Sequence, residues 1–221
     1  MRLVINLPSL YSYGFDKYNI VAYTGIERPE LLSAARQIRD YFSNDDEFLT
    51  IRVFVRGILV DSLFNSREIL HMKDVKGLVK GVYRIQELTG LYLLVFAVVG
   101  LYLRRRQFLP SLARYVGMGG GATLGIAVLA GLGTLIGFER LFLLFHLLSF
   151  SNDLWQLDPR TDYLIAMFPE GFFFDATIWI ASSTILQALL LAIVPFTLLR
   201  WWPRKTLNRA ERRLAARAQA R

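Results

Sequence analysis

The chain has 221 residues, of which 54% are hydrophobic and 20% charged, and its mean hydropathy is +0.36. This composition is too apolar for an ordinary soluble domain and does not fit a disordered, collagen-like or coiled-coil chain. Because the sequence contains no cysteine, a disulfide scaffold, a cysteine-ligated zinc site, an iron–sulfur cluster and a thiol nucleophile are excluded.

The first 87 residues carry the patterns of small folded elements. Residues 29–43 place apolar side chains at helical spacing and begin with a proline, which predicts an amphipathic helix. Residues 48–64 are rich in β-branched and aromatic residues around Gly57, which predicts a short hairpin or two edge strands. Asn65 and Glu68 have the spacing of a capping pair and predict the start of a membrane-proximal helix that runs into the first apolar segment.

Three later stretches contain no charged residue, namely 88–103, 115–138 and 176–199. The last two have about 24 residues each, enough to cross a hydrocarbon core of roughly 30 Å with some tilt. The first has about 16, so it spans only if residues before it take part. We therefore predict three transmembrane helices in a polytopic, mainly α-helical membrane bundle with a small α/β part outside the membrane.

The charges between these segments predict the orientation. Residues 104–114 carry a net charge of +4 and residues 200–221 a net charge of +7, so both are expected in the cytoplasm. Residues 139–175 carry a net charge of −4 and residues 1–87 a net charge of +1, so both are expected outside. The overall charge of +8 is thus interpreted as an orientation signal, and we expect no binding of nucleic acid.

An exported first segment needs a hydrophobic helix before it, and residues 1–7 are too short to serve as one. We therefore expect a further N-terminal helix, either missing from this sequence or truncated to these residues.

Residues 139–175 are too apolar for a solvated loop, although acidic residues are spaced through them. Residues 138–150 have the length of an interfacial or re-entrant helix. The aromatic residues that follow resemble a belt at headgroup depth, so this segment is expected to lie against the outer leaflet.

Glycines repeat along the second apolar segment, with Gly117, Gly121 and Gly125 at the spacing that allows close helix packing. Packing within one chain is the preferred interpretation and a homodimer the alternative, so we expect a monomer.

The two histidines of the sequence, His71 and His146, both fall on the predicted outer side, where histidine suits proton transfer near neutral pH. Glu68 and Asp74 lie three residues before and after His71, on one helical face, and could orient its imidazole. The acids after His146 include Asp153, Asp158 and Glu170, each of which is equally interpretable as a solvated or capping residue. We expect no metal site and no cofactor, because two histidines and a carboxylate without compact spacing make a poor ligand set.

Residues 11–26, 64–78 and 145–173 together resemble the bacterial family that includes the lipoprotein intramolecular transacylase. The elements that carry this resemblance are HM-x-DVK and F-x-ND-x-W-x-LDP…FPE-x-FF. Members usually begin with a transmembrane helix before the first exported segment, and this sequence departs from the pattern there.

The resemblance implies a multi-pass enzyme of the bacterial cytoplasmic membrane that acts on diacylglyceryl lipoproteins at its outer face. The sn-2 acyl chain of the modified N-terminal cysteine would move to the α-amino group of the same cysteine. His71 and His146 would act as an acid/base pair, or one of them would take the acyl group covalently for an instant. Asp74 or Asp153 would orient an imidazole. Lys76, Asn152 or Trp155 would donate to the oxyanion or contact the peptide, while membrane lipids surround the spans.

Two other functions remain open at this point. A non-catalytic membrane scaffold or partner-binding module explains the glycine face and the aromatic belt, but it gives no reason for two histidines in one compartment. A metal-dependent membrane hydrolase is the other alternative.

Overall fold

The computed structural model describes residues 6–218, with the side chains of all but residues 135–136, 198–199 and 201–218. The expectation that residues 1–7 are the end of an upstream helix therefore lies largely outside the described residues. The chain forms two compact units, one of Met1–Thr89 with Gly133–Ile180 and one of Gly90–Leu132 with Ala181–Arg221.

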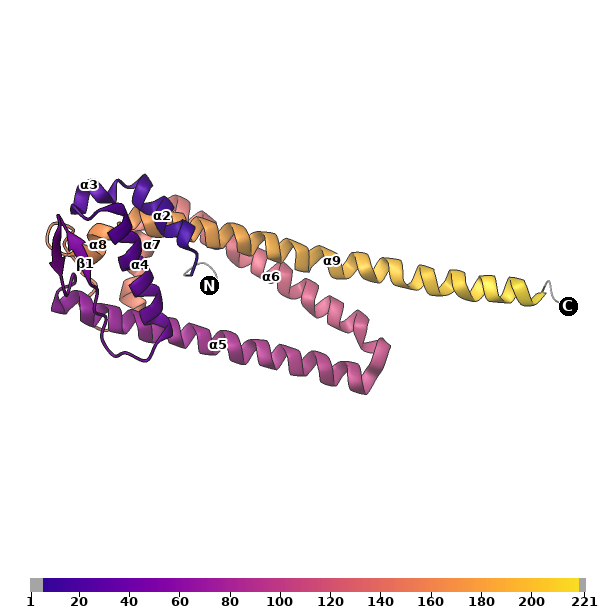
Figure 1. The fold of residues 1–221 in the computed structure, drawn as a ribbon. Helices are drawn as coiled ribbons and strands as arrows, with labels where there is room; N and C mark the ends of the chain where they lie inside the picture. Colours follow the sequence, from indigo (N-terminus) through magenta and orange to yellow (C-terminus); the bar gives the residue numbers. More distant parts are fainter. Residues whose placement is uncertain (1–5, 219–221) are drawn as a thin grey trace. The chain divides into compact units, whose positions relative to one another are not determined.

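The described part of the chain is mainly helical, as the composition predicts (Figure 1). In chain order its elements are α2 (Pro8–Lys17), α3 (Ile20–Thr24), α4 (Arg28–Ser43), β1 (Val53–Val55), β2 (Ile58–Val60), α5 (Ser66–Arg104), the 3₁₀ helix η1 (Arg105–Phe108), α6 (Leu109–Ile136), α7 (Phe138–Ser149), α8 (Tyr163–Met167) and α9 (Glu170–Ala218).

The first unit has its core between the N-terminal helices and the segment around α8. Its fully buried side chains include Phe15, Leu31 and Met167, which come from α2, α4 and α8. Tyr11 of α2 packs edge-on against Phe168, with 6.1 Å between the ring centroids. Burial of apolar surface between these helices joins the N-terminal helices and the distant segment around α8 in one folded body.

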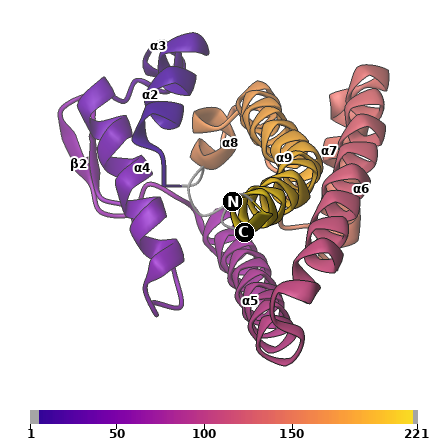
Figure 2. The same cartoon turned by 90° about the vertical axis from the view of Figure 1, so that its right-hand side faces the viewer.

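The hairpin predicted around Gly57 is present beside α4 (Figure 2). Strands β1 and β2 are antiparallel, with Phe54 opposite Leu59. The loop has two residues, Arg56 and Gly57, and both have positive φ angles, of 51° and 80°. This geometry is the one that two-residue hairpin loops need, and glycine adopts it without steric cost.

The second unit contains the later part of α5, η1, most of α6 and the later part of α9. Two helical stretches, Ser66–Thr134 and Glu170–Thr197, are long and apolar enough to cross a membrane. In their most apolar windows 0% and 6% of the residues are buried within the protein, so these side chains are left for lipid to cover. The first stretch contains the turn at η1, and its division into spans at 88–103 and 115–138 stays a prediction.

The glycine-rich face of α6 packs against α9 at two positions. At Gly117 a Cβ atom would overlap the ring of Phe196, and at Gly120 it would lie 2.7 Å from the Ala192 backbone nitrogen. Gly121 and Gly125 have nothing within 4 Å, so the predicted packing within the chain is wrong for them. The contact depends on Gly120, which is one residue away from the predicted series.

Gly120→Ala is expected to lower the free energy of unfolding by about 1–3 kcal/mol, because its Cβ would push against backbone atoms of α9 that cannot turn away. Gly121→Ala is the matched control, because the neighbouring position has open space and gains helix propensity. Thermal unfolding of both purified variants in the same detergent measures the difference. Equal midpoints for the two variants would contradict the close approach of α6 and α9.

Candidate active site

The two histidines meet within the first unit, although they are 75 residues apart in the sequence. His71 lies in the second turn of α5 and His146 in α7, and their ring centroids are 6.3 Å apart with an angle of 30° between the planes. His71 is 6% exposed and His146 is 8% exposed. Two helices thus bring both imidazoles to one nearly buried place.

Aromatic side chains surround this pair. The ring of Phe150 lies 5.1 Å from that of His71 and 5.8 Å from that of His146. His146 also contacts Phe142 at 4.4 Å and Trp155 at 5.1 Å. Phe142 and Phe150 were not among the residues predicted for the site, although they precede and follow His146 by four positions. For Phe142 that spacing is the signal that could have identified it, because residues four apart share one face of a helix, whereas Phe150 follows the end of α7 in extended conformation.

The hydrogen bond of His146 defines which of its nitrogens is available. Its Nδ1 lies 2.7 Å from the backbone carbonyl oxygen of Phe142. A carbonyl only accepts hydrogen bonds, so this nitrogen carries the proton and donates it. In the neutral ring the lone pair is then on Nε2, which is the atom able to accept a proton.

His71 is in the opposite situation, because its Nδ1 is buried without a hydrogen-bond partner among the described residues. Burial and, to a smaller extent, the neighbouring His146 lower the pKa of His71 to about 4, against the opposing effect of the Asp74 charge. The ring is therefore neutral near pH 7. A buried polar atom without a partner is costly and is characteristic of sites where a ligand supplies the missing bond.

The low pKa of His71 predicts an acid-sensitive fold. The unfolded chain takes up the proton near pH 6.5 and the folded chain only near pH 4, so stability is complete above pH 6.5 and falls as the pH drops towards 4. From pH 7 to pH 5 this histidine should remove about 2 kcal/mol. Unfolding of the wild type and of His71→Asn across this range measures the effect. The variant should show the shallower pH dependence, and parallel curves would contradict the prediction.

The loop after α7 is tied to α5 next to the histidines. The Asn152 side-chain amide donates to the Asp74 carboxylate at 2.8 Å, across 78 residues of sequence. Arg67 donates to the backbone carbonyl of Asp153. Three of the predicted residues, Asp74, Asn152 and Trp155, are therefore brought near the histidines, and the bond between Asp74 and Asn152 holds the loop that carries Trp155. The side chain of Asp153 instead accepts a bond from Gln156.

Glu68 does not orient His71 as the spacing predicts. Its carboxylate is 1% exposed and accepts bonds from the backbone nitrogens of Asn65, at 2.7 Å, and Leu164, at 2.6 Å. The predicted capping pair is confirmed, since the backbone nitrogen of Glu68 also donates to the Asn65 side chain. Glu68 connects the start of α5 to α8, which positions the helix that carries His71.

Three other predicted residues are engaged away from the histidines. The ammonium of Lys76 donates to Asn44 and to the Asp46 carbonyl and lies 3.9 Å from the centre of the Tyr41 ring. Asp158 pairs with Arg160 at 2.7 Å, and Glu170 opens α9, where a carboxylate stabilises the first turn. Five positions along a helix place the side chain of Lys76 on a different face of α5 from that of His71.

Known proteins are similar to this chain in sequence and in fold. Residues 1–173 match the family model described as lipoprotein intramolecular transacylase Lit. The membrane-integral lipoprotein intramolecular transacylase Lit from Bacillus cereus is similar in fold, with a TM-score of 0.67 and 24% identity over 92% of this chain and 86% of that one. For the same protein with one histidine replaced by alanine, the TM-score is 0.67 and the identity is 23%, over 90% of this chain and 84% of that one.

No curated protein matches the chain. The family model covers more than three quarters of the sequence, including both histidines and the aromatic residues around them. The chain therefore belongs to the lipoprotein intramolecular transacylase family, a family of membrane-integral acyltransferases.

Proposed function

We propose that this enzyme moves the sn-2 acyl chain of a diacylglyceryl-cysteine to the α-amino group of the same cysteine, using His71 and His146 for proton transfer. The substrate is the lipidated N-terminus of a bacterial lipoprotein, and the product is an N-acylated lyso-form. The observation that carries the proposal is the meeting of the two imidazoles, 6.3 Å apart between centroids, in a nearly buried aromatic site.

The chemistry needs acceptors for two N–H protons and a donor for the leaving oxygen. A base removes a proton from the ammonium group, and the amine nitrogen attacks the ester carbonyl carbon. The tetrahedral intermediate then gives its second N–H proton to an imidazole, and an imidazole passes a proton to the glycerol oxygen as the C–O bond breaks, so that glycerol leaves as an alcohol. One imidazole serves as the base and the other as the donor to the leaving oxygen, which is the division of roles that general acid–base catalysis requires.

The state of each ring supports this division. His146 has its proton fixed on Nδ1, so Nε2 is free to accept one. His71 has an unsatisfied nitrogen that a substrate N–H or a leaving oxygen would satisfy. Because the amine and the ester belong to one molecule, holding them in attack geometry supplies much of the rate enhancement.

Trp155 is our choice for the donor to the oxyanion. It contacts His146, and its indole N–H makes no hydrogen bond within the part of the chain that the structure describes. Of the other two predicted donors, Asn152 is held by Asp74 and Lys76 is held by Asn44 and Asp46. A donor aimed at the developing negative charge stabilises the transition state more than the substrate.

We place this site at the outer face of the bacterial cytoplasmic membrane, with three spans and a cytoplasmic C-terminus, on the basis of the charge distribution between the apolar segments. Membership of an enzyme family removes the scaffold alternative. Membership of a transacylase family likewise favours acyl transfer over the metal-dependent hydrolase.

Mass spectrometry of a lipoprotein N-terminal peptide tests the proposal. The protein is expressed in a bacterium that cannot otherwise N-acylate its lipoproteins, and peptides are compared with and without it. Transfer of one acyl group from glycerol to nitrogen at unchanged total mass is the expected result. Loss of the acyl group with gain of water would instead identify a hydrolase.

A further inference from the structure

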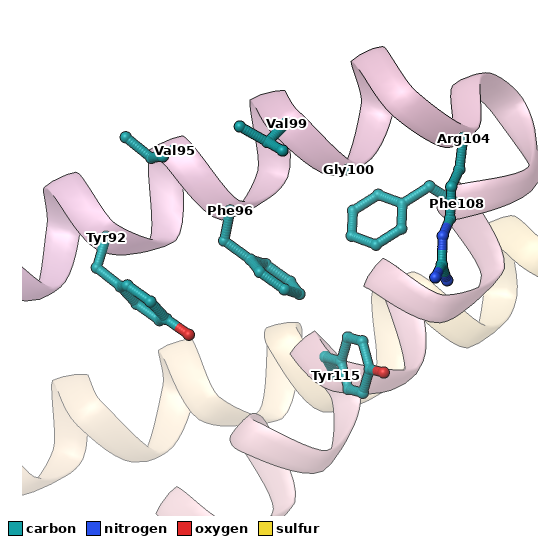
Figure 3. A pocket seen from close by; sticks show the side chains of 8 residues that line it. All are labelled: Tyr92, Val95, Phe96, Val99, Gly100, Arg104, Phe108 and Tyr115. Carbon is teal, nitrogen blue, oxygen red and sulfur yellow. The ribbon is translucent and has the colours of Figure 1, made fainter.

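A hollow lies between the end of α5 and the start of α6, far along the chain from the histidines. It has a volume of about 410 Å³ and is confined to residues 92–115 of the second unit. Figure 3 shows Tyr92 and Phe96 on α5 and Tyr115 on α6 around an open space, with Arg104 and Phe108 at the end near the turn. Nothing in the proposed acyl transfer uses it.

The turn at η1 is built to keep this hollow open. Phe108 is 5% exposed, and its ring lies over Gly100, where a Cβ atom would overlap it. Phe96 contacts Phe108 at 5.5 Å and Tyr115 at 6.0 Å, both edge to face. These rings hold the two helices apart at a fixed distance and give the hollow an apolar wall.

The charge at one end of the hollow has no acidic partner among the side chains that the structure describes. Arg104 extends its guanidinium past Phe108 towards α6 (Figure 3). No ion pair of Arg104 occurs among the described side chains, and the sequence has no acidic residue between Glu87 and Glu139. A guanidinium in a largely apolar wall favours an anionic oxygen ligand, which it can hold with two hydrogen bonds.

The expected level of the hollow in the membrane indicates which kind of anion it could bind. Arg104 directly follows the uncharged segment 88–103, so it lies where apolar chain gives way to charge. Tyr92 precedes it by twelve residues, which is about 18 Å along a helix. The hollow therefore offers a cationic end at headgroup level and an apolar wall, including Val95 and Val99, at acyl-chain level.

We infer that this hollow binds one anionic phospholipid, with its phosphate on Arg104 and an acyl chain along Val95, Phe96 and Val99. The basic loop 104–114 attracts such lipids to this end of the helices in general. The hollow converts this attraction into binding of a single molecule, because it combines one fixed charge with an apolar groove.

Native mass spectrometry of the full-length protein in detergent tests this inference, with phosphatidylglycerol and phosphatidylcholine of the same chain length added in turn. The wild type should retain one phosphatidylglycerol and bind phosphatidylcholine more weakly. Arg104→Gln should weaken phosphatidylglycerol binding about tenfold, the scale of one lost charge-assisted hydrogen bond. Arg106→Gln removes the same charge from the same loop without lining the hollow, and it should keep the tight binding.

Val99→Trp tests the apolar wall independently, because its larger ring fills the groove and should weaken both lipids. An excess of soluble glycerol phosphate should not displace the bound lipid if the acyl chain contributes. Equal weakening by the two arginine variants would show attraction to the loop alone and overturn the inference. Displacement by glycerol phosphate, or unchanged binding in Val99→Trp, would do the same.

Discussion

Replacing His71 or His146 with alanine is expected to reduce acyl transfer by about 10²–10⁴-fold, the range typical of a lost general acid or base. Each variant leaves one imidazole in the site, so proton uptake from the amine and proton donation to the leaving oxygen would have to use the same ring in succession. The double variant should be little worse than the more severe single one, because residues that act as a unit are not additive.

The assay is the rate of appearance of N-acylated peptide, followed by mass spectrometry with purified enzyme and a diacylglyceryl peptide. Arg140→Ala is the matched control, because it changes an exposed residue on the same helix as His146. His71→Asn and His146→Asn keep a polar side chain of smaller size and separate lost chemistry from lost packing. Near wild-type rates in both alanine variants would remove the histidines from the mechanism.

Glu68→Ala is expected to have the largest effect on stability, lowering the free energy of unfolding by about 2–5 kcal/mol. The change leaves the backbone nitrogens of Asn65 and Leu164 without their acceptor. Water cannot easily replace that acceptor, because Glu68 is only 1% exposed. It also removes the contact that joins the first turn of α5 to α8. We therefore expect slower acyl transfer at temperatures where the variant is still folded, because His71 lies one turn further along α5.

Chemical or thermal unfolding in one detergent measures this loss. Asp40→Ala is the control, because this exposed carboxylate on α4 makes no side-chain hydrogen bond among the described residues. Glu68→Gln should be intermediate, since an amide oxygen can accept one of the two backbone bonds but its NH₂ group repels the other donor. A Glu68→Ala variant as stable as Asp40→Ala would show that the buried carboxylate contributes nothing.

The elements that depend on neighbouring residues could be predicted from the sequence. The amphipathic pattern of 29–43 became α4, the capping pair of Asn65 and Glu68 formed, and α5 continues without a break into residues 88–103. These features depend on side chains three or four positions apart, and such spacings are visible in a sequence.

The partners that come from distant segments could not be predicted. Leu164 is 96 residues from the carboxylate of Glu68, and Asn152 is 78 residues from Asp74. Only the packing of α7 and α8 against α5 decides which acid meets which donor. The spacing correctly places Glu68 within one turn of His71 on α5. Its carboxylate nevertheless accepts hydrogen bonds from the backbone nitrogens of Asn65 and Leu164 and does not bind the imidazole.

The aromatic rings around the two imidazoles also decide which nucleophile the ester can meet. Water that entered the site would compete with the amine for the activated ester, and the result would be a free fatty acid instead of an amide. Phe142, Phe150 and Trp155 occupy the space beside His146 that solvent would otherwise fill. In the proposed reaction, we expect these rings to limit hydrolysis of the acyl chain while it passes from oxygen to nitrogen.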